Sequence, residues 1–155
     1  RYSVYWTNLA LLGILILMAI TIGIKAYILV QLPIMIIGAA VGVWLFYVQH
    51  QFEGVYWERH NNWDYATAAL LGSSFYKLPK VLQWFTGNIG FHHIHHLSPR
   101  IPNYHLERCY HENPIFQEVS PITLPSSLKS LTLRLWDEEG QRLVGFDYLK
   151  TVSVE

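Results

Sequence analysis

The sequence carries little charge for its length. Of its 155 residues, 14% are charged and 52% are hydrophobic, whereas a soluble domain usually has about a quarter charged residues. The composition therefore favours a membrane protein. Eleven basic and eleven acidic residues cancel. This balance argues against a nucleic-acid partner, because binding phosphate requires a basic surplus or patch.

Several signatures of enzymes are also missing. The sequence contains no P-loop, no G-x-S-x-G motif and no glycine fingerprint for a dinucleotide. Its single cysteine, Cys109, excludes an internal disulfide framework. No catalytic base is visible beside Cys109, so it does not indicate a nucleophile. The first residue is Arg1 rather than methionine, so we expect the true N-terminus to lie upstream, and the length fits one domain at most.

Two long apolar runs fill the first part of the sequence. Residues 8–24 contain no charged side chain, and after Lys25 the run resumes over residues 26–48. Each is close to the ~20 residues that a helix needs to cross a bilayer. Lys25 and Pro33 fit a short turn, so residues 1–48 are predicted to form a transmembrane helical hairpin. Two central helices of a soluble core are the alternative, but the chain has too little polar sequence to surround them.

Most charged residues and all eight histidines follow residue 48. A hairpin returns to its starting side, so segment 49–155 shares a face with Arg1, and the positive-inside tendency assigns that face to the cytosol. We expect an interfacial helical cap there, with helices over residues 64–76, 80–96 and 103–112. The tail is predicted to be helical from Pro125, although its TLRLW also fits a strand. The predicted fold class is an all-α membrane protein: a hairpin followed by a cytosolic cap.

The motif GFHHIHH, residues 90–96, places four histidines within five positions. On an α-helix each residue advances about 100°, so His92, His95 and His96 share an arc of about 100° and point three imidazoles in one direction. His93 lies at the edge of this arc and is predicted to support the ligands without binding the metal itself. Neutral imidazole is a common ligand of Zn, Cu, Fe and Ni, and no thiolate is nearby. The motif therefore predicts a metal site, with a surface histidine cluster as the alternative.

A fifth histidine, His50, follows the second apolar run where the helix would leave the bilayer. Ionisable groups at such depth are functional candidates. His50 is therefore predicted to be a further ligand, with a snorkelling interfacial histidine as the alternative. Glu53, three residues on, would share its helical face. Asn88, four residues before His92, would orient a ligand or a metal-bound water, unless it merely starts the helix.

The remaining histidines have polar surroundings. His105 and His111 lie among charged residues and are predicted to be exposed. Three roles fit His60: an exposed surface residue, a contact to a lipid headgroup, or a residue that supports a metal ligand. Asp64 is predicted to cap a helix that begins at Tyr65.

Two stretches support a family resemblance: FYVQHQFEGVYW, residues 46–57, and GNIGFHHIHHLSPRIPNY, residues 87–104. Together with the apolar runs they resemble the membrane fatty acid desaturases, most closely the bacterial and cyanobacterial Δ12/ω-6 acyl-lipid type. The resemblance runs from Arg1 to about Phe146. The family's first two histidine boxes are absent here. The sequence thus resembles the C-terminal half of a desaturase, and this segment alone is not expected to be active.

The resemblance implies a site, a reaction and partners. Two non-haem iron ions would be held on the cytosolic face, with His92, His95 and His96 matching the third histidine box and His50 the isolated ligand. The enzyme would use O₂ to introduce a double bond into a fatty acyl lipid held in an apolar tunnel. Its electrons would come from ferredoxin or a cytochrome b5-like donor, and membrane lipid would surround it. Candidates for lining the tunnel, each of which also fits ordinary interfacial packing, are Phe75, Tyr76, Trp84 and Phe85.

Three other functions fit parts of the sequence. A related histidine-box hydroxylase, ketolase or alkane monooxygenase would share the H-x-x-H-H motif. A transporter fragment or other non-catalytic metal-binding membrane module would need polar residues within the apolar runs, which have nearly none. A purely structural membrane anchor would leave GFHHIHH unexplained.

Overall fold

A computed structural model describes residues 2–152 of the chain. Arg1, expected on the cytosolic side, lies outside the described residues. The chain divides into two compact units, Arg1–Trp44 and Leu45–Glu155, and each is considered by itself.

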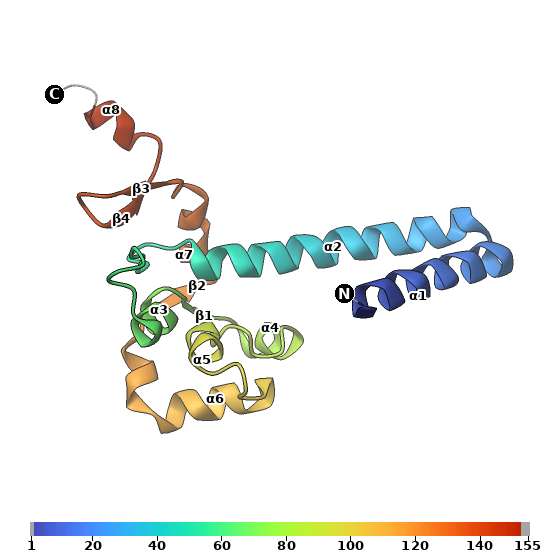
Figure 1. Ribbon diagram of the computed structural model, residues 1–155, viewed down its shortest axis with the longest axis horizontal. Helices are drawn as coiled ribbons and strands as arrows, with labels where there is room; N and C mark the ends of the chain where they lie inside the picture. The colour runs from blue at the N-terminus through green and yellow to red at the C-terminus, as the bar shows by residue number, and fades with distance from the viewer. Residues whose placement is uncertain (1, 153–155) are drawn as a thin grey trace. The chain divides into compact units, whose positions relative to one another are not determined.

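The first unit is entirely helical over its described residues. Helix α1 (Tyr2–Met18) leads through a π-helical turn, η1 (Ala19–Gly23), into α2 (Ile24–His50), whose last residues belong to the second unit (Figure 1). Gly23 has φ +86°, a left-handed conformation that glycine adopts readily because it lacks Cβ. The turn expected between Lys25 and Pro33 is wrong, because both residues lie inside α2. The break in α-helical geometry falls instead at η1, where glycine can accommodate it.

The apolar side chains of this unit are exposed. The helical stretch Tyr2–His50 is long and apolar enough, by length and composition alone, to cross a membrane, and none of its most apolar window is buried. Leucine, isoleucine and valine side chains cover its surface. A continuous apolar surface of this extent is typical of contact with lipid or with another protein. The polar Thr21 hydroxyl is satisfied within the helix, because it donates to the Leu17 carbonyl at 2.7 Å.

The second unit is built from short elements around a small core. Helices α3 (Tyr65–Leu71), α5 (His92–Leu97) and α6 (Asn103–Glu112) gather beside strand β1 (Phe75–Lys77) (Figure 1). The buried core side chains are Phe75, Phe91, Ile94, Leu106 and Phe116. Burying a side chain of this size stabilises a fold by about 1.5–3 kcal/mol, so this core fixes α5 against its neighbours.

Two expected helices of the cap are present, with revised bounds for one. Helix α6 has the predicted bounds 103–112. The helix expected over residues 64–76 is confirmed only as α3, because the chain becomes extended at β1. The Asp64 side chain accepts a hydrogen bond from the Thr67 N–H at 2.8 Å, which confirms the predicted N-cap.

The helix predicted over residues 80–96 is wrong as a single element. It is divided into α4 (Lys80–Phe85) and α5. Between them Gly87 and Asn88 have φ +60° and +59°, values that end an α-helix. An isolated bridge between Phe75 and Phe91 then ties the start of α5 to β1.

The tail contains strands as well as helical turns, so the all-α prediction holds only for most of the chain. Strand β2 (Pro121–Thr123) pairs in parallel with β1. The 3₁₀ helix η2 (Pro114–Glu118) precedes it, and α7 (Leu124–Ser127) and η3 (Leu128–Leu131) follow it. Strand β3 (Leu135–Asp137) pairs antiparallel with β4 (Arg142–Val144), and α8 (Tyr148–Val152) closes the described chain. The extended alternative for TLRLW is therefore correct for its last two residues.

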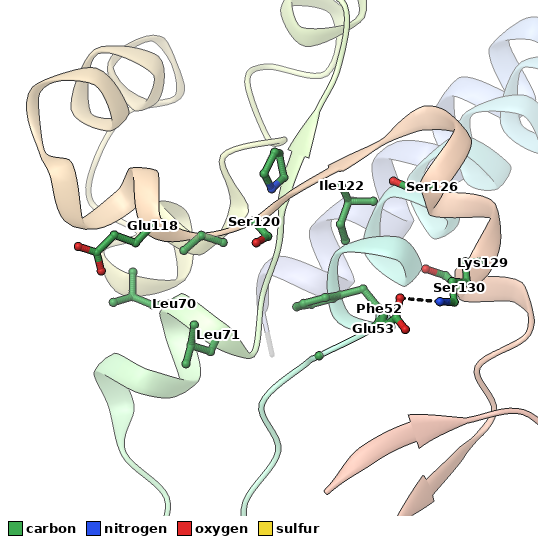
Figure 2. A pocket seen from close by; sticks show the side chains of 13 residues that line it. Phe52, Glu53, Leu70, Leu71, Glu118, Ser120, Ile122, Ser126, Lys129 and Ser130 are labelled. Carbon is green, nitrogen blue, oxygen red and sulfur yellow. Dashed lines mark hydrogen bonds and ion pairs between the residues drawn. The ribbon is translucent and has the colours of Figure 1, made fainter. Parts of the chain in front are cut away.

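A pocket of about 390 Å³ lies where the tail meets the loop that follows α2. Phe52 and Glu53 line it from the loop and Leu70 and Leu71 from α3 (Figure 2). The later part of the chain contributes residues 118–122, Ser126, Lys129 and Ser130. The tail is thus in place beside the segment that follows His50.

Candidate metal centre

Helix α5 presents two histidines one turn apart. His92 is its first residue and His96 its fifth, so both lie on one face of the helix. The start of α5 is held by a hydrogen bond from the Tyr76 N–H to the Gly90 carbonyl, 2.7 Å long. A side chain at Gly90 would collide with the Tyr76 carbonyl oxygen. The glycine that opens GFHHIHH therefore permits the close approach of β1 to the helix that carries the histidines.

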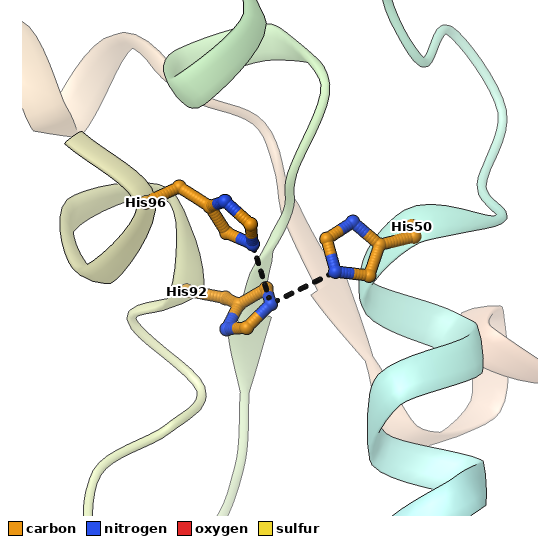
Figure 3. A group of neighbouring side chains, drawn as sticks. All are labelled: His50, His92 and His96. Atoms are coloured by element: carbon orange, nitrogen blue, oxygen red, sulfur yellow. Dashed lines mark hydrogen bonds between the residues drawn. The ribbon is translucent and has the colours of Figure 1, made fainter. Parts of the chain in front are cut away.

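Three histidines converge on one point. Nε2 of His92 lies 3.1 Å from Nε2 of His50 and 3.0 Å from Nε2 of His96 (Figure 3). Their three potential ligand atoms all lie within 4.8 Å of one another. At a metal–nitrogen distance of about 2.1 Å, two ligands at right angles are about 3.0 Å apart. The spacing therefore fits imidazoles arranged around a single metal ion.

The environment keeps these imidazoles neutral. Burial, and to a smaller extent the neighbouring His96 and His50, together lower the pKa of His92 to about 3. The pKa of His96 is also lowered, first by burial and then by His50 and His95. A neutral imidazole offers the lone pair that a metal needs, so the cluster is ready to bind a metal at neutral pH.

His95 lies beside the cluster but outside its point of convergence. Its ring centroid lies 5.7 Å from that of His92 and 6.0 Å from that of His96. The group of converging ligand atoms found within residues 2–152 contains His50, His92 and His96. Three of the four predicted ligands are therefore brought together, and the half-buried His95 flanks them.

His93 points into the core. It is completely buried, and its ring centroid lies 5.8–6.1 Å from those of Phe75, Tyr110 and Phe116. Neither ring nitrogen makes a hydrogen bond to the described residues. Burial lowers its pKa to about 4. The polar main-chain groups of Phe116 and Ser74 raise the pKa, but by less than burial lowers it. His93 therefore packs behind the helix that carries the ligands.

Asn88 and Glu53 do not occupy the helical faces expected for them. Asn88 lies in the turn before α5, where its Nδ2 donates to the Asn103 carbonyl at 2.9 Å. Glu53 follows the end of α2, and its carboxylate pairs with the Lys129 ammonium at 2.6 Å. The helical spacing used for both residues fails because neither helix extends that far. Both side chains instead join separate segments of the cap.

The four tunnel candidates do not share one environment. Phe75 and Tyr76 are buried in the cap, where the Tyr76 hydroxyl lies 3.1 Å from the Ser127 hydroxyl. Trp84 and Phe85 on α4 are 75% and 72% exposed, and their ring centroids are 5.0 Å apart. Phe75 and Tyr76 therefore contribute to packing, and Trp84 and Phe85 form an apolar pair on the surface.

The histidines predicted to be exposed are exposed. This holds for His105 and His111, and His60, for which several positions were open, is exposed as well. His111 lies 3.9 Å from the Glu107 carboxylate on the outer side of α6. The pKa of the Cys109 thiol is raised, mainly by burial, which agrees with the absence of a nucleophilic role.

Two residues beside His50 were not assigned a role from the sequence. The Gln49 side chain donates to the Ile89 carbonyl at 2.7 Å, and the Gln51 side chain donates to the Leu133 carbonyl at 2.6 Å. The sequence marks these two residues only by the motif QHQ, in which a glutamine stands on each side of a histidine at the end of an apolar run. The partners of both amides lie far along the chain and could not be inferred from it.

The family model described as fatty acid desaturase matches residues 1–121. A fatty acid desaturase of Bacillus subtilis (strain 168) is 50% identical over 154 residues, which is 99% of this chain and 44% of that relative. An sn-1 oleoyl-lipid 12-desaturase of Anabaena variabilis is 36% identical over 63 residues, 41% of this chain and 18% of that relative. No solved structure matches the chain.

The match to the family covers most of the chain, including all three converging histidines. The chain spans less than half the length of the Bacillus relative. The chain belongs to the fatty acid desaturase family.

Proposed function

We propose that the chain is the part of an oxygen-dependent, di-iron membrane fatty acid desaturase that supplies the third histidine box and the isolated histidine. The observation that supports this most strongly is the convergence of Nε2 atoms from His50, His92 and His96. Two of these histidines come from α5 and the third from the end of the long apolar helix α2. The centre would therefore lie where α2 ends.

The donor set fits iron. Imidazole is a suitable ligand for iron, and neutral nitrogen donors resist oxidation better than a thiolate would. The only cysteine, Cys109, is not part of the converging group. Bound iron, together with O₂, would supply the oxidising power needed to remove hydrogen from unactivated CH₂ groups of the acyl chain.

Three converging imidazoles are too few for two iron ions. We propose that His95, beside the cluster, also binds metal after a change of side-chain rotamer, and that further ligands come from the family's other two histidine boxes. His93 would act indirectly, by packing α5 against the aromatic core. Asn88 and Glu53 would support the site only through the contacts that hold the cap together.

The proposed placement in the membrane is a hairpin over residues 1–48 and a cytosolic cap over residues 49–155. Its support is the exposed apolar surface of Tyr2–His50 together with the break at Gly23. Because most Lys and Arg residues belong to the cap, the positive-inside tendency favours the cytosolic face for it. The protein would then be multi-pass, with its metal centre at the cytosolic surface.

The proposed substrate is the acyl chain of a membrane lipid. The Anabaena relative is an sn-1 oleoyl-lipid 12-desaturase. Ferredoxin or a cytochrome b5-like protein would supply the electrons. The exposed pair Trp84 and Phe85 on α4 is available to contact the lipid or its acyl chain.

The function is tested by expressing the full natural protein in a bacterial host that lacks a desaturase. Gas chromatography of the host's fatty acids should show a new unsaturated species, and the purified protein should contain iron. A hydroxylated or keto product would support a related histidine-box oxidase instead. Iron-free protein without a product would argue for a structural or transport role.

A further inference from the structure

His50 lies between two glutamines whose side chains reach in different directions. It is the last residue of α2, and a helix end is held less firmly than its interior because its last carbonyls lack intrahelical partners. The His50 ring packs against Phe46, with ring centroids 4.8 Å apart, and its orientation also depends on contacts made by its neighbours. Gln49 and Gln51 make these contacts with two segments far along the chain.

Gln49 joins His50 to the segment that precedes α5. Its side-chain amide donates to the main-chain carbonyl of Ile89 at 2.7 Å, and Ile89 lies three residues before His92. The main-chain carbonyl of Gln49 accepts from the Ser74 N–H at 3.0 Å. Gln49 is only 1% exposed. Buried hydrogen bonds of this kind are costly to lose because they leave a polar group unsatisfied. The bond from Gln49 to Ile89 therefore sets the separation between the two histidine-bearing segments.

Gln51 joins His50 to the tail. Its side-chain amide donates to the Leu133 carbonyl at 2.6 Å. Two further contacts link the same segments. The Tyr47 hydroxyl donates to the Ser130 carbonyl at 2.9 Å. Lys129 pairs with Glu53 at 2.6 Å (Figure 2). The family model ends at residue 121, so these contacts come from a part of the chain beyond the matched domain.

We propose that Gln49 and Gln51 are positioning residues, which aim the His50 imidazole at His92 by fixing the end of α2 to the α5 segment on one side and to the tail on the other. This inference rests on the proposed metal centre. A ligand displaced by a fraction of an ångström binds its metal less well, and groups that orient ligands typically change metal affinity by about 10- to 100-fold. The tail thereby becomes part of the metal centre's support.

The test uses Co²⁺ as a probe metal with the full natural protein purified in detergent. Gln49→Met and Gln51→Met keep the side-chain length and remove the amide. Gln141→Met is the matched control, because the Gln141 amide also donates to a main-chain carbonyl, that of Glu138 at 2.7 Å, but within a local turn of the tail. Co²⁺ affinity and the visible spectrum of the bound ion are measured for each, together with the thermal unfolding midpoint.

Gln49→Met and Gln51→Met should each bind Co²⁺ about 10- to 100-fold more weakly and alter the visible spectrum of the bound ion. Gln141→Met should have the Co²⁺ affinity and spectrum of the unaltered protein. The decisive step repeats Gln51→Met in a His50→Ala background. A residue that acts through His50 should then change Co²⁺ affinity by less than about twofold, as a double-mutant cycle requires. If Gln49→Met does not fold, the half-buried Gln51 position decides the question.

Two results would overturn the inference. Unchanged Co²⁺ affinity in both Gln49→Met and Gln51→Met would show that the glutamines do not position His50. An equal loss in the presence and absence of His50 would assign Gln51 a general structural role. If the unaltered protein binds no Co²⁺ or iron, the proposed metal centre fails and this inference fails with it, so the two failures are distinguishable.

Discussion

The Nε2 atom of His92 lies 3.1 Å from the Nε2 atom of His50, although 42 positions separate the two residues. His50 ends the long apolar helix, and His92 begins the short helix α5. Both rings are partly or fully shielded from water, and His92 is only 7% exposed. The contact has the length of an N–H···N hydrogen bond between neutral imidazoles, and the same spacing suits two ligands of one metal ion.

The histidines should differ in what they contribute to metal binding. His50→Ala, His92→Ala and His96→Ala should each abolish desaturation and lower bound iron, because each removes a nitrogen from the converging set. His95→Ala should do the same if His95 completes the ligand set in the holoprotein. The assay is the fatty acid profile of a host expressing each variant in the full natural protein, together with iron content.

Two substitutions serve as comparisons for this series. His93→Ala should lower iron content less than the ligand substitutions, because its side chain packs in the core. Groups that support ligands typically change metal affinity by about 10- to 100-fold. His111→Ala, on the exposed side of α6, should be silent. Equal losses in all variants would point to a general need for histidines and would contradict the assignment of ligands.

Acid should destabilise the metal-free protein partly through His93. Its pKa is about 4 in the fold, against 6.5 for an unperturbed histidine. The unfolded chain therefore binds more protons between these values, so stability present above pH 6.5 is lost as the pH falls towards 4. The loss from this residue is at most about 3 kcal/mol. His93→Leu should reduce the difference in unfolding free energy between pH 7 and pH 4.

The control for the acid experiment is His111→Leu, whose position is exposed. It should retain the full acid dependence of the unaltered protein. Denaturant titrations in the presence of a chelator measure both. If His93→Leu remains as sensitive to acid as the control, His93 is protonated in the fold or the segment around it opens before global unfolding.

A methyl group at Gly90 should disrupt the approach of β1 to α5. In Gly90→Ala the new side chain would meet the Tyr76 carbonyl oxygen, and overpacking of this kind typically costs about 1–3 kcal/mol. The thermal midpoint and the iron content should both fall. Gly13→Ala is the matched control, since no atom lies within 4 Å of its Cβ position in α1. Equal behaviour of the two variants would show that β1 can move away freely.

The proposed topology can be tested with single cysteines in a Cys109→Ser background. His60→Cys and His111→Cys should react with a membrane-impermeant thiol reagent only after the cells are permeabilised. Thr21→Cys, in the turn between α1 and α2, should react in intact cells. Labelling of positions 60 and 111 from outside would place the cap on the opposite face and refute the cytosolic assignment.

Sequence alone determined the features that depend on neighbouring residues. The length and apolarity of the first two runs predicted a helical stretch able to span a membrane, and the H-x-x-H-H spacing predicted that His92 and His96 share a helical face. The Asp64 cap and the bounds of α6 also followed from local patterns. Periodicity and capping act over a few residues, so the sequence expresses them directly.

The tertiary structure decided what packing between distant segments controls. The expected helix over residues 80–96 is interrupted at Gly87 and Asn88, because Phe91 must reach β1. Packing also turns His93 into the aromatic core and leaves His95 beside the converging set. The partners of Gln49 and Gln51 are carbonyl groups 40 and 82 positions away. Every residue has a carbonyl group, so no side-chain pattern marks which one a glutamine will find; only the folded chain brings those atoms within hydrogen-bonding distance.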